Sequence, residues 1–123
     1  MVAIDDSNRG AVNRAISNIR SEIDQTLAKI EGATKLLDDP GMAVLHGRIR
    51  RSVYGLNNYL VGLRRDLATL ERAIRRGQIS NDVLTRLIPP GGEYHTPRDV
   101  LEDNLRLLDE LLQKRQRNDG HPL

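Results

Sequence analysis

Apolar residues recur at alternating intervals of three and four positions along the first third of the chain. The series comprises Val12, Ile16, Ile19, Ile23, Thr26, Ile30, Ala33 and Leu37. This spacing is typical of the seam of a coiled-coil helix, and it predicts a helix over residues 7–39 with Asp6 or Ser7 as its cap. Because a residue that precedes proline is disfavoured in helical geometry, the helix should stop at Asp39, and Pro40-Gly41 is predicted to form a turn.

A second heptad series follows over residues 42–76. Nine of its ten seam positions are apolar: Met42, Ile49, Leu56, Leu63 and Leu70 at d, and His46, Val53, Leu60, Leu67 and Ile74 at a, with His46 as the exception. Two helices of similar length joined by a short turn must run antiparallel. Residues 7–76 are therefore predicted to form a helical hairpin about 50 Å long at 1.5 Å per residue.

Further apolar residues widen the stripe on both predicted helices. They are Leu27, Leu36, Leu45, Tyr59 and Val61. Two helices cover such a stripe from one side only, so either the chain's own C-terminal helix or a second copy of the hairpin has to cover the rest. We favour the second copy, which predicts an all-α fold in which two long antiparallel hairpins dimerise into a four-helix bundle.

Glycine and proline divide the last third of the chain. Gly77 should end the second helix, and Ser80 should cap a short helix through Ile88, so residues 1–88 are predicted to form the hairpin with a short third helix. Residues 89–96 contain Pro89-Pro90-Gly91-Gly92 and are predicted to be a linker. An amphipathic helix is predicted over 97–116, and the tail 117–123 is predicted to be disordered.

Composition excludes several classes of protein. The chain has no cysteine, and its only aromatic residues are three tyrosines. Disulfide scaffolds and thiolate metal sites are excluded, and neither a β-sandwich core nor a base-stacking sheet is expected. No apolar run approaches the roughly 20 residues that cross a bilayer, and the first residues lack the order of a signal peptide. We therefore expect a cytoplasmic protein.

Residues suited to catalysis or metal binding are few. His46 lies at a seam position, His95 in the linker and His121 in the tail, and none has a partner at metal-ligand spacing, although Glu93 is close to His95. A lone histidine on an apolar face is more often a hydrogen-bonded junction residue than a base. The sequence predicts no enzyme, no cofactor and no metal site.

The formal net charge of +2 conceals an uneven distribution. Residues 7–39 carry five basic and five acidic side chains, whereas residues 42–76 carry eight arginines, no lysine and only Asp66 and Glu71, which gives +6. The arginines are Arg48, Arg50, Arg51, Arg64, Arg65, Arg72, Arg75 and Arg76. An exposed helix needs charge in any case, but the exclusive use of arginine and the mutual repulsion favour a polyanionic partner.

Six residues of this helix are predicted to contact nucleic acid. Arg51, Asn58, Arg65 and Arg72 share the outward f position at intervals of about 10.5 Å, and Arg48 and Arg76 extend the line at c. Arg50 and Arg64, at e, could instead pair with acidic residues of the first helix.

Three interior glycines lie beside this line. Gly47, Gly55 and Gly62 each cost roughly 1 kcal/mol relative to alanine. Such a cost indicates close approach, either by another helix or by a phosphate-sugar backbone, for which Ser52 and Asn57 offer further polar groups.

A long basic helix with only two tyrosines suits a duplex better than a single strand, and double-stranded RNA is recognised mainly by shape. The hairpin over residues 7–76, its turn at Pro40-Gly41, the arginine-rich second helix, the short helix after Gly77 and the lack of a catalytic set resemble the small RNA-silencing suppressors of nodaviruses. The resemblance implies a viral homodimer that binds double-stranded RNA without sequence preference and shields it from nucleases. The alternative is a non-enzymatic helical-bundle adaptor or scaffold that binds an acidic protein.

Overall fold

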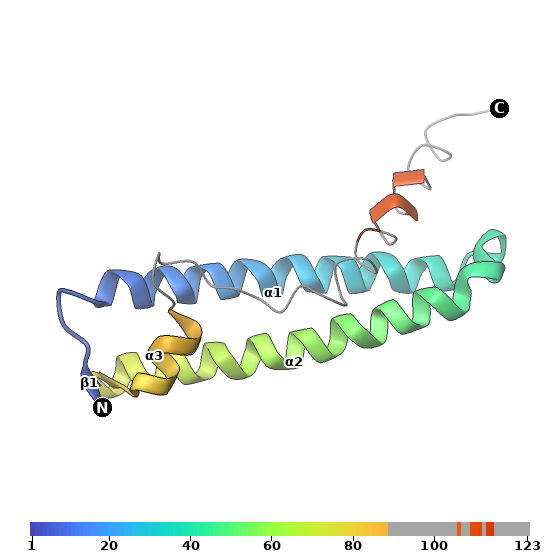
Figure 1. Ribbon diagram of the computed structural model, residues 1–123. Helices are drawn as coiled ribbons and strands as arrows, with labels where there is room; N and C mark the ends of the chain where they lie inside the picture. The colour runs from blue at the N-terminus through green and yellow to red at the C-terminus, as the bar shows by residue number, and fades with distance from the viewer. Residues whose placement is uncertain (89–105, 107–108, 112, 115–123) are drawn as a thin grey trace. The chain divides into compact units, whose positions relative to one another are not determined.

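The computed structural model describes residues 1–88, 106, 109–111 and 113–114 (Figure 1). Its elements are β1 (Val2–Ala3), α1 (Arg9–Leu37), the 3₁₀ helix η1 (Pro40–Leu45), α2 (His46–Arg76), β2 (Gln78–Ile79) and α3 (Asn81–Leu87). The chain divides into two compact units, Met1–Gln25 with Leu60–Thr96 and Thr26–Tyr59 with Pro97–Leu123. In each unit a segment of α1 runs antiparallel to a segment of α2. The predicted helical character and hairpin arrangement are confirmed.

The start of α1 differs from the prediction. The backbone N–H of Ser7 donates to the Asp5 carboxylate over 2.9 Å, and the Ser7 hydroxyl donates to the same oxygen. The Asn8 side chain donates to the Ala3 carbonyl and accepts from the Asp5 N–H, each over 3.0 Å. The side chains of Asp5 and Asn8, rather than Asp6 or Ser7, therefore accept the backbone N–H groups of the turn before α1. The hydrogen bond from the Asn8 amide to the Ala3 carbonyl also links the start of the helix to β1.

The connection between the long helices is longer than the predicted turn. Asp39 has the extended backbone expected before proline, and its carboxylate accepts the Gly41 N–H over 2.9 Å. The residues from Pro40 to Leu45 then continue as η1, so α2 begins at His46 rather than Met42. The His46 ring Nε2 lies 3.3 Å from the Asp39 carbonyl oxygen. A carbonyl can only accept, so this nitrogen carries the proton, and His46 is the hydrogen-bonded junction residue that the sequence indicated.

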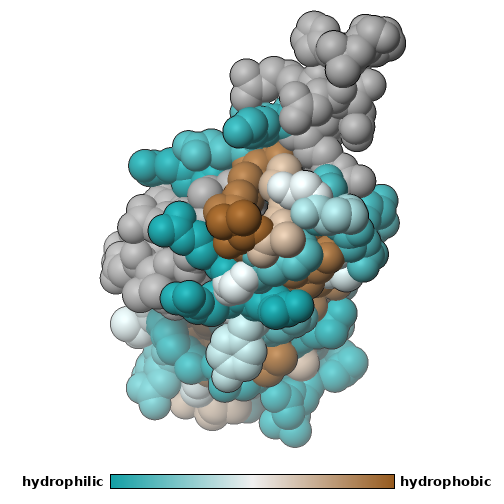
Figure 2. Space-filling model, turned by 90° about the vertical axis from the view of Figure 1, so that its right-hand side faces the viewer, coloured by the Kyte–Doolittle hydropathy of each residue, from teal (hydrophilic) through white to brown (hydrophobic). Residues whose placement is uncertain are grey.

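An exposed apolar side chain lies in η1. Val44 is 97% exposed. The face that Figure 2 shows, viewed from the side on which η1 lies in Figure 1, has a hydrophobic patch with hydrophilic residues around it.

The unit with both strands has a core built from α1, α2, β2, α3 and Ile4, the residue that follows β1. Its large buried hydrophobic residues are Ile4, Val12, Ile16, Ile19, Leu60, Leu63, Leu70, Ile79 and Leu87. β1 pairs antiparallel with β2, with Val2 opposite Ile79. Gly77, at a φ of +70°, reverses the chain after α2, and its carbonyl accepts the Ile4 N–H over 2.9 Å.

Two sequence predictions in this unit are confirmed. Gly77 follows directly on α2, and the Ser80 hydroxyl caps α3 by accepting the Val83 N–H over 3.2 Å. α3 ends at Leu87, one residue earlier than predicted. The two short strands were not predicted, because segments of two residues are too short for an alternating pattern.

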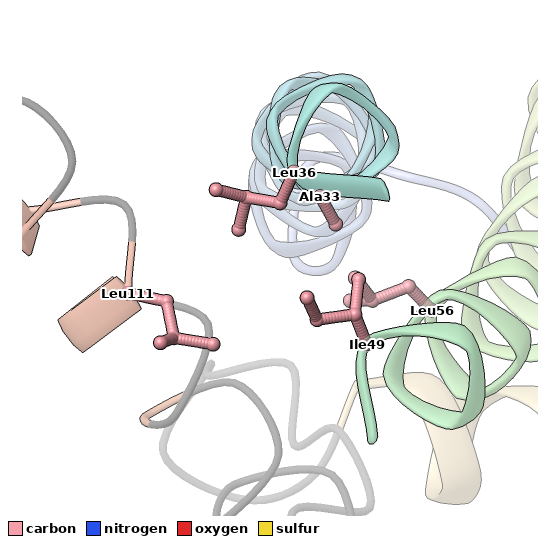
Figure 3. Close-up of a cluster of buried hydrophobic side chains, with 5 residues drawn as sticks. All are labelled: Ala33, Leu36, Ile49, Leu56 and Leu111. Carbon is pink, nitrogen blue, oxygen red and sulfur yellow. The ribbon is translucent and has the colours of Figure 1, made fainter. Parts of the chain in front are cut away.

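The core of the second unit joins three parts of the chain. Ala33 and Leu36 from α1, Ile49 and Leu56 from α2, and Leu111 point toward one another (Figure 3). Leu111 is 7% exposed, and the Lys29 ammonium lies 3.8 Å from the Asp109 carboxylate on the same segment.

The packing of Leu111 shows that the chain itself covers part of the apolar stripe. Leu36, one of the residues expected to need a second hairpin, is fully buried within the chain. The residues described between 106 and 114, which fall within the predicted helix over 97–116, are helical. The rest of that helix, the predicted linker 89–96 and the predicted tail 117–123 lie outside the described residues.

Candidate nucleic-acid interface

The burial pattern along α2 fixes which side of the helix is free. All four d residues within α2 are buried (Ile49, Leu56, Leu63 and Leu70). At g, Ser52 and Ala73 are buried, whereas at a only Leu60 is buried and Ile74 is 36% exposed. The buried side is therefore centred between d and g, not between a and d. Positions e, b and f consequently face away from the core.

Because the buried side of α2 lies between d and g and not between a and d, two predictions are wrong. Ser52 is 1% exposed, and its hydroxyl donates to the Arg48 carbonyl over 3.0 Å, so it is not available to a sugar or phosphate. Val61 does not widen the core stripe, because it lies at b and is 64% exposed. Asn57 and Asn58 are exposed, as the polar face requires.

All eight arginines of α2 are exposed, and we call them together with Asn57 and Asn58 the arginine face. Of the residues predicted to bind nucleic acid, Arg48, Arg51 and Asn58 belong to one unit and Arg65, Arg72 and Arg76 to the other. They are carried by one uninterrupted helix, on which residues seven positions apart are separated by about 10.5 Å.

No arginine of α2 makes an ion pair with a described residue. Arg50 and Arg64 are exposed, and the alternative in which they pair with acidic residues of α1 is not found among the described side chains. Glu71 pairs with Arg20 of α1, with 3.6 Å between nitrogen and oxygen. The pairing directs this acidic side chain toward α1, so it does not neutralise the arginine face.

Two exposed residues at b were not recognised as part of this face. Tyr54 is 71% exposed and lies one turn after Arg50 and Arg51 and one turn before the two asparagines. Val61 precedes Arg64 and Arg65 by one turn. A heptad assignment centred on d and g would have placed both on the exposed side.

The space around two of the interior glycines is open. A Cβ added at Gly47 or Gly62 would meet no atom within 4 Å outside its own stretch of helix. Packing of another described element therefore does not explain these two glycines. Gly55 is half-buried.

The described residues offer no alternative chemical centre on this helix. Among them, no group of three His, Asp or Glu side chains is placed to hold a metal ion. None of the described helices has both the length and the apolar composition of a membrane span. His95 and His121 lie outside the described residues.

Comparison with known proteins adds no family assignment. No protein-family model matches the chain, and no curated protein or solved structure was found to be similar to it.

Proposed function

We propose that this protein binds double-stranded RNA without sequence preference through the arginine face of α2. The observation that supports the proposal is that eight exposed arginines on one helix have no acidic partner among the described residues. Like charges placed so close together repel one another, and a polyanion that neutralises them removes this repulsion. Guanidinium groups also match phosphate with two parallel hydrogen bonds.

The kind of contact determines the kind of specificity. Arginine contacts to phosphate position a protein on a duplex but carry no sequence information. The exposed amides of Asn57 and Asn58 can donate to and accept from 2′-hydroxyls, which distinguish RNA from DNA. A helix of 31 residues can contact phosphates along its length without entering a groove.

The proposal includes a homodimer in which two hairpins form a four-helix bundle and present two arginine faces. Its biological role would be to shield duplex RNA from processing nucleases, as a suppressor of RNA silencing does. The oligomeric state can be tested independently of RNA binding.

Fluorescence anisotropy tests the binding proposal. Duplex RNAs of unrelated sequence, duplex DNA and single-stranded RNA are titrated at two salt concentrations. We expect the duplex RNAs to bind with equal affinity, and more tightly than duplex DNA or single-stranded RNA. Their affinity should fall steeply as the salt concentration rises, because binding releases counterions. Absence of binding to every nucleic acid at low salt would refute the proposal.

A second candidate function is supported by Tyr54 and Val61. Their exposed apolar surface lies among the arginines, and a phosphate backbone gives Val61 no apolar partner. An acidic protein helix could pair its carboxylates with the arginines and pack its own apolar residues on Tyr54 and Val61. Such a partner is expected of an adaptor or scaffold. Replacing Val61 with Ser should leave affinity for RNA unchanged if the first proposal holds. Binding to poly-glutamate but not to RNA would favour the adaptor.

A further inference from the structure

A hollow lies at the end of α2 in the unit that contains both strands. Its volume is about 280 Å³, just below the roughly 300–1,000 Å³ of small-molecule sites. The polar side chains that line it are Thr69, Arg72, Arg76, Gln78 and Ser80. None of the described residues that line it carries a carboxylate, so none of them neutralises the two arginines.

The two arginines are arranged to act together. Arg72 and Arg76 are four residues apart on α2, which places them on the same side of the helix with their Cβ atoms about 5–6 Å apart. The Arg72 Nε donates to the Ala68 carbonyl over 3.4 Å, which leaves both terminal nitrogens for a ligand. Guanidinium pairs of this kind bind phosphate oxygens through charge-assisted hydrogen bonds.

Neutral donors complete the polar side of the hollow. The Ser80 oxygen accepts the Val83 N–H, so its own proton remains free to be donated. Gln78 is exposed, and β2 uses its backbone, which leaves its amide available. Thr69 donates to the Arg65 carbonyl over 3.0 Å, and it can therefore only accept from a ligand.

The remaining lining is apolar. Met1 and Val83 provide most of its surface, since Met1 is 74% exposed and Val83 is half-buried. Ala73 and Ile79 also line the hollow but are only 8% and 1% exposed. An inorganic phosphate would leave this surface without a partner. A phosphate attached to a sugar and base would use both the cationic and the apolar parts.

We propose that this hollow binds the terminal phosphate monoester of a nucleic-acid strand, with Arg72, Arg76, Gln78 and Ser80 at the phosphate and the terminal nucleoside against Met1 and Val83. The inference rests on the proposed function. It places the end of an RNA strand at the hollow, where α2 and the arginine face end. A phosphate monoester carries about −1.5 to −2 charges at pH 7, whereas each internal diester carries one. Paired guanidinium groups therefore favour the end of a strand over its interior.

The test compares two RNA duplexes that differ only in a 5′-phosphate or a 5′-hydroxyl. We expect the protein to bind the phosphorylated duplex about tenfold more tightly. In Arg76→Gln this preference should disappear. Arg75→Gln is the matched control, because it removes the same charge from the neighbouring residue, which does not line the hollow. It should retain the preference while losing a similar share of general affinity.

A second variant keeps the proposal testable if Arg76→Gln does not fold. Gln78→Ala alters an exposed side chain whose β pairing is made by the backbone, so the fold should persist and the preference should fall severalfold. Melting curves of all variants accompany the titrations. A preference that survives in both Arg76→Gln and Gln78→Ala would overturn the assignment of the hollow.

Free ligands distinguish the possible sources of the phosphate. Adenosine 5′-monophosphate and inorganic phosphate are titrated as competitors. Equal affinity for the two duplexes would overturn the strand-end site while leaving duplex binding intact. Binding of the free nucleotide that is lost in Arg76→Gln, without any preference between duplexes, would assign the hollow to free nucleotides and also overturn it. If neither duplex binds, the proposed function itself fails.

Discussion

A single glycine tests whether the arginine face is free in the unbound protein. A methyl group added at Gly62 meets no atom within 4 Å outside its own stretch of helix. Gly62→Ala should therefore raise the free energy of unfolding by up to about 1 kcal/mol, because alanine has the higher helix propensity and restricts the unfolded chain. Chemical denaturation measures this change. The same variant should lose affinity for duplex RNA if a phosphate-sugar backbone approaches the glycine.

Gly77 provides the control for Gly62→Ala. Its φ of +70° is disfavoured for residues with a Cβ, although the space around it is equally open. Gly77→Ala should lower the free energy of unfolding by about 1–2 kcal/mol. If Gly62→Ala were also destabilising, another helix would have to pack on Gly62, which would remove this glycine from an RNA site.

The carboxyl group of Asp5 gives the turn before α1 a dependence on pH. Hydrogen bonds from the Ser7 hydroxyl and the Ser7 N–H lower the pKa of Asp5 below its ordinary value of 3.8. The folded state therefore binds this proton more weakly than the unfolded state, and the stabilisation is present above the unfolded pKa and lost as pH falls through the folded pKa. The difference in melting temperature between the native protein and Asp5→Ala should narrow between about pH 5 and pH 2. A constant difference would contradict this role.

At the scale of the element, the arginines of α2 should act additively and without sequence preference. Replacing Arg51, Arg65 or Arg72 by alanine should weaken binding to unrelated duplexes with 5′-hydroxyl ends to the same extent, and each should reduce the salt slope by about one. Titrations at several salt concentrations measure both effects. Arg14→Ala on α1 removes the same charge elsewhere and is the control. Unchanged binding in the triple variant would move the site away from α2.

The sequence predicted the existence of the long helices better than it predicted their orientation. Heptad spacing follows from the chain alone, but which neighbouring positions become buried depends on how closely the partner helix approaches. The small side chains of Ser52 and Ala73 lie buried at g, while the larger Ile74 at a stays partly exposed. The same rotation exposes Val61, which the apolar pattern had assigned to the core.

The other differences between sequence and structure involve segments without a period. Residues 42–45 are compatible with α or 3₁₀ geometry, and only the Asp39 cap and the His46 contact distinguish the two. β1 and β2 pair over a large separation in sequence, which no local pattern reveals. The arginines could be identified from the sequence alone, whereas the hollow at Arg72 and Arg76 requires β2 and α3 to be in place.

At the scale of the whole molecule, Leu111 tests whether the C-terminal segment supports the long helices. It is 7% exposed and packs in the cluster with Leu36 and Ile49. Leu111→Ala should cost about 2–5 kcal/mol of stability, the usual range for a buried leucine. Lys114→Ala, an exposed change on the same segment, should cost little. Equal stability of the two variants would mean that this segment does not contribute to the core.

The proposed dimer requires apolar surface that the chain itself leaves uncovered. Leu111 of the C-terminal segment packs on part of the stripe, but Leu27 remains 40% exposed on α1. Leu27→Glu should therefore dissociate a four-helix bundle while each hairpin keeps its helicity. Leu63→Glu, at a residue that is 1% exposed, should unfold the protein because it buries a charge without a partner. Sedimentation at micromolar concentration, with circular dichroism of each variant, measures both outcomes. A native protein that sediments as a fully helical monomer would show that intrachain packing is sufficient, and a duplex would then meet one arginine face rather than two.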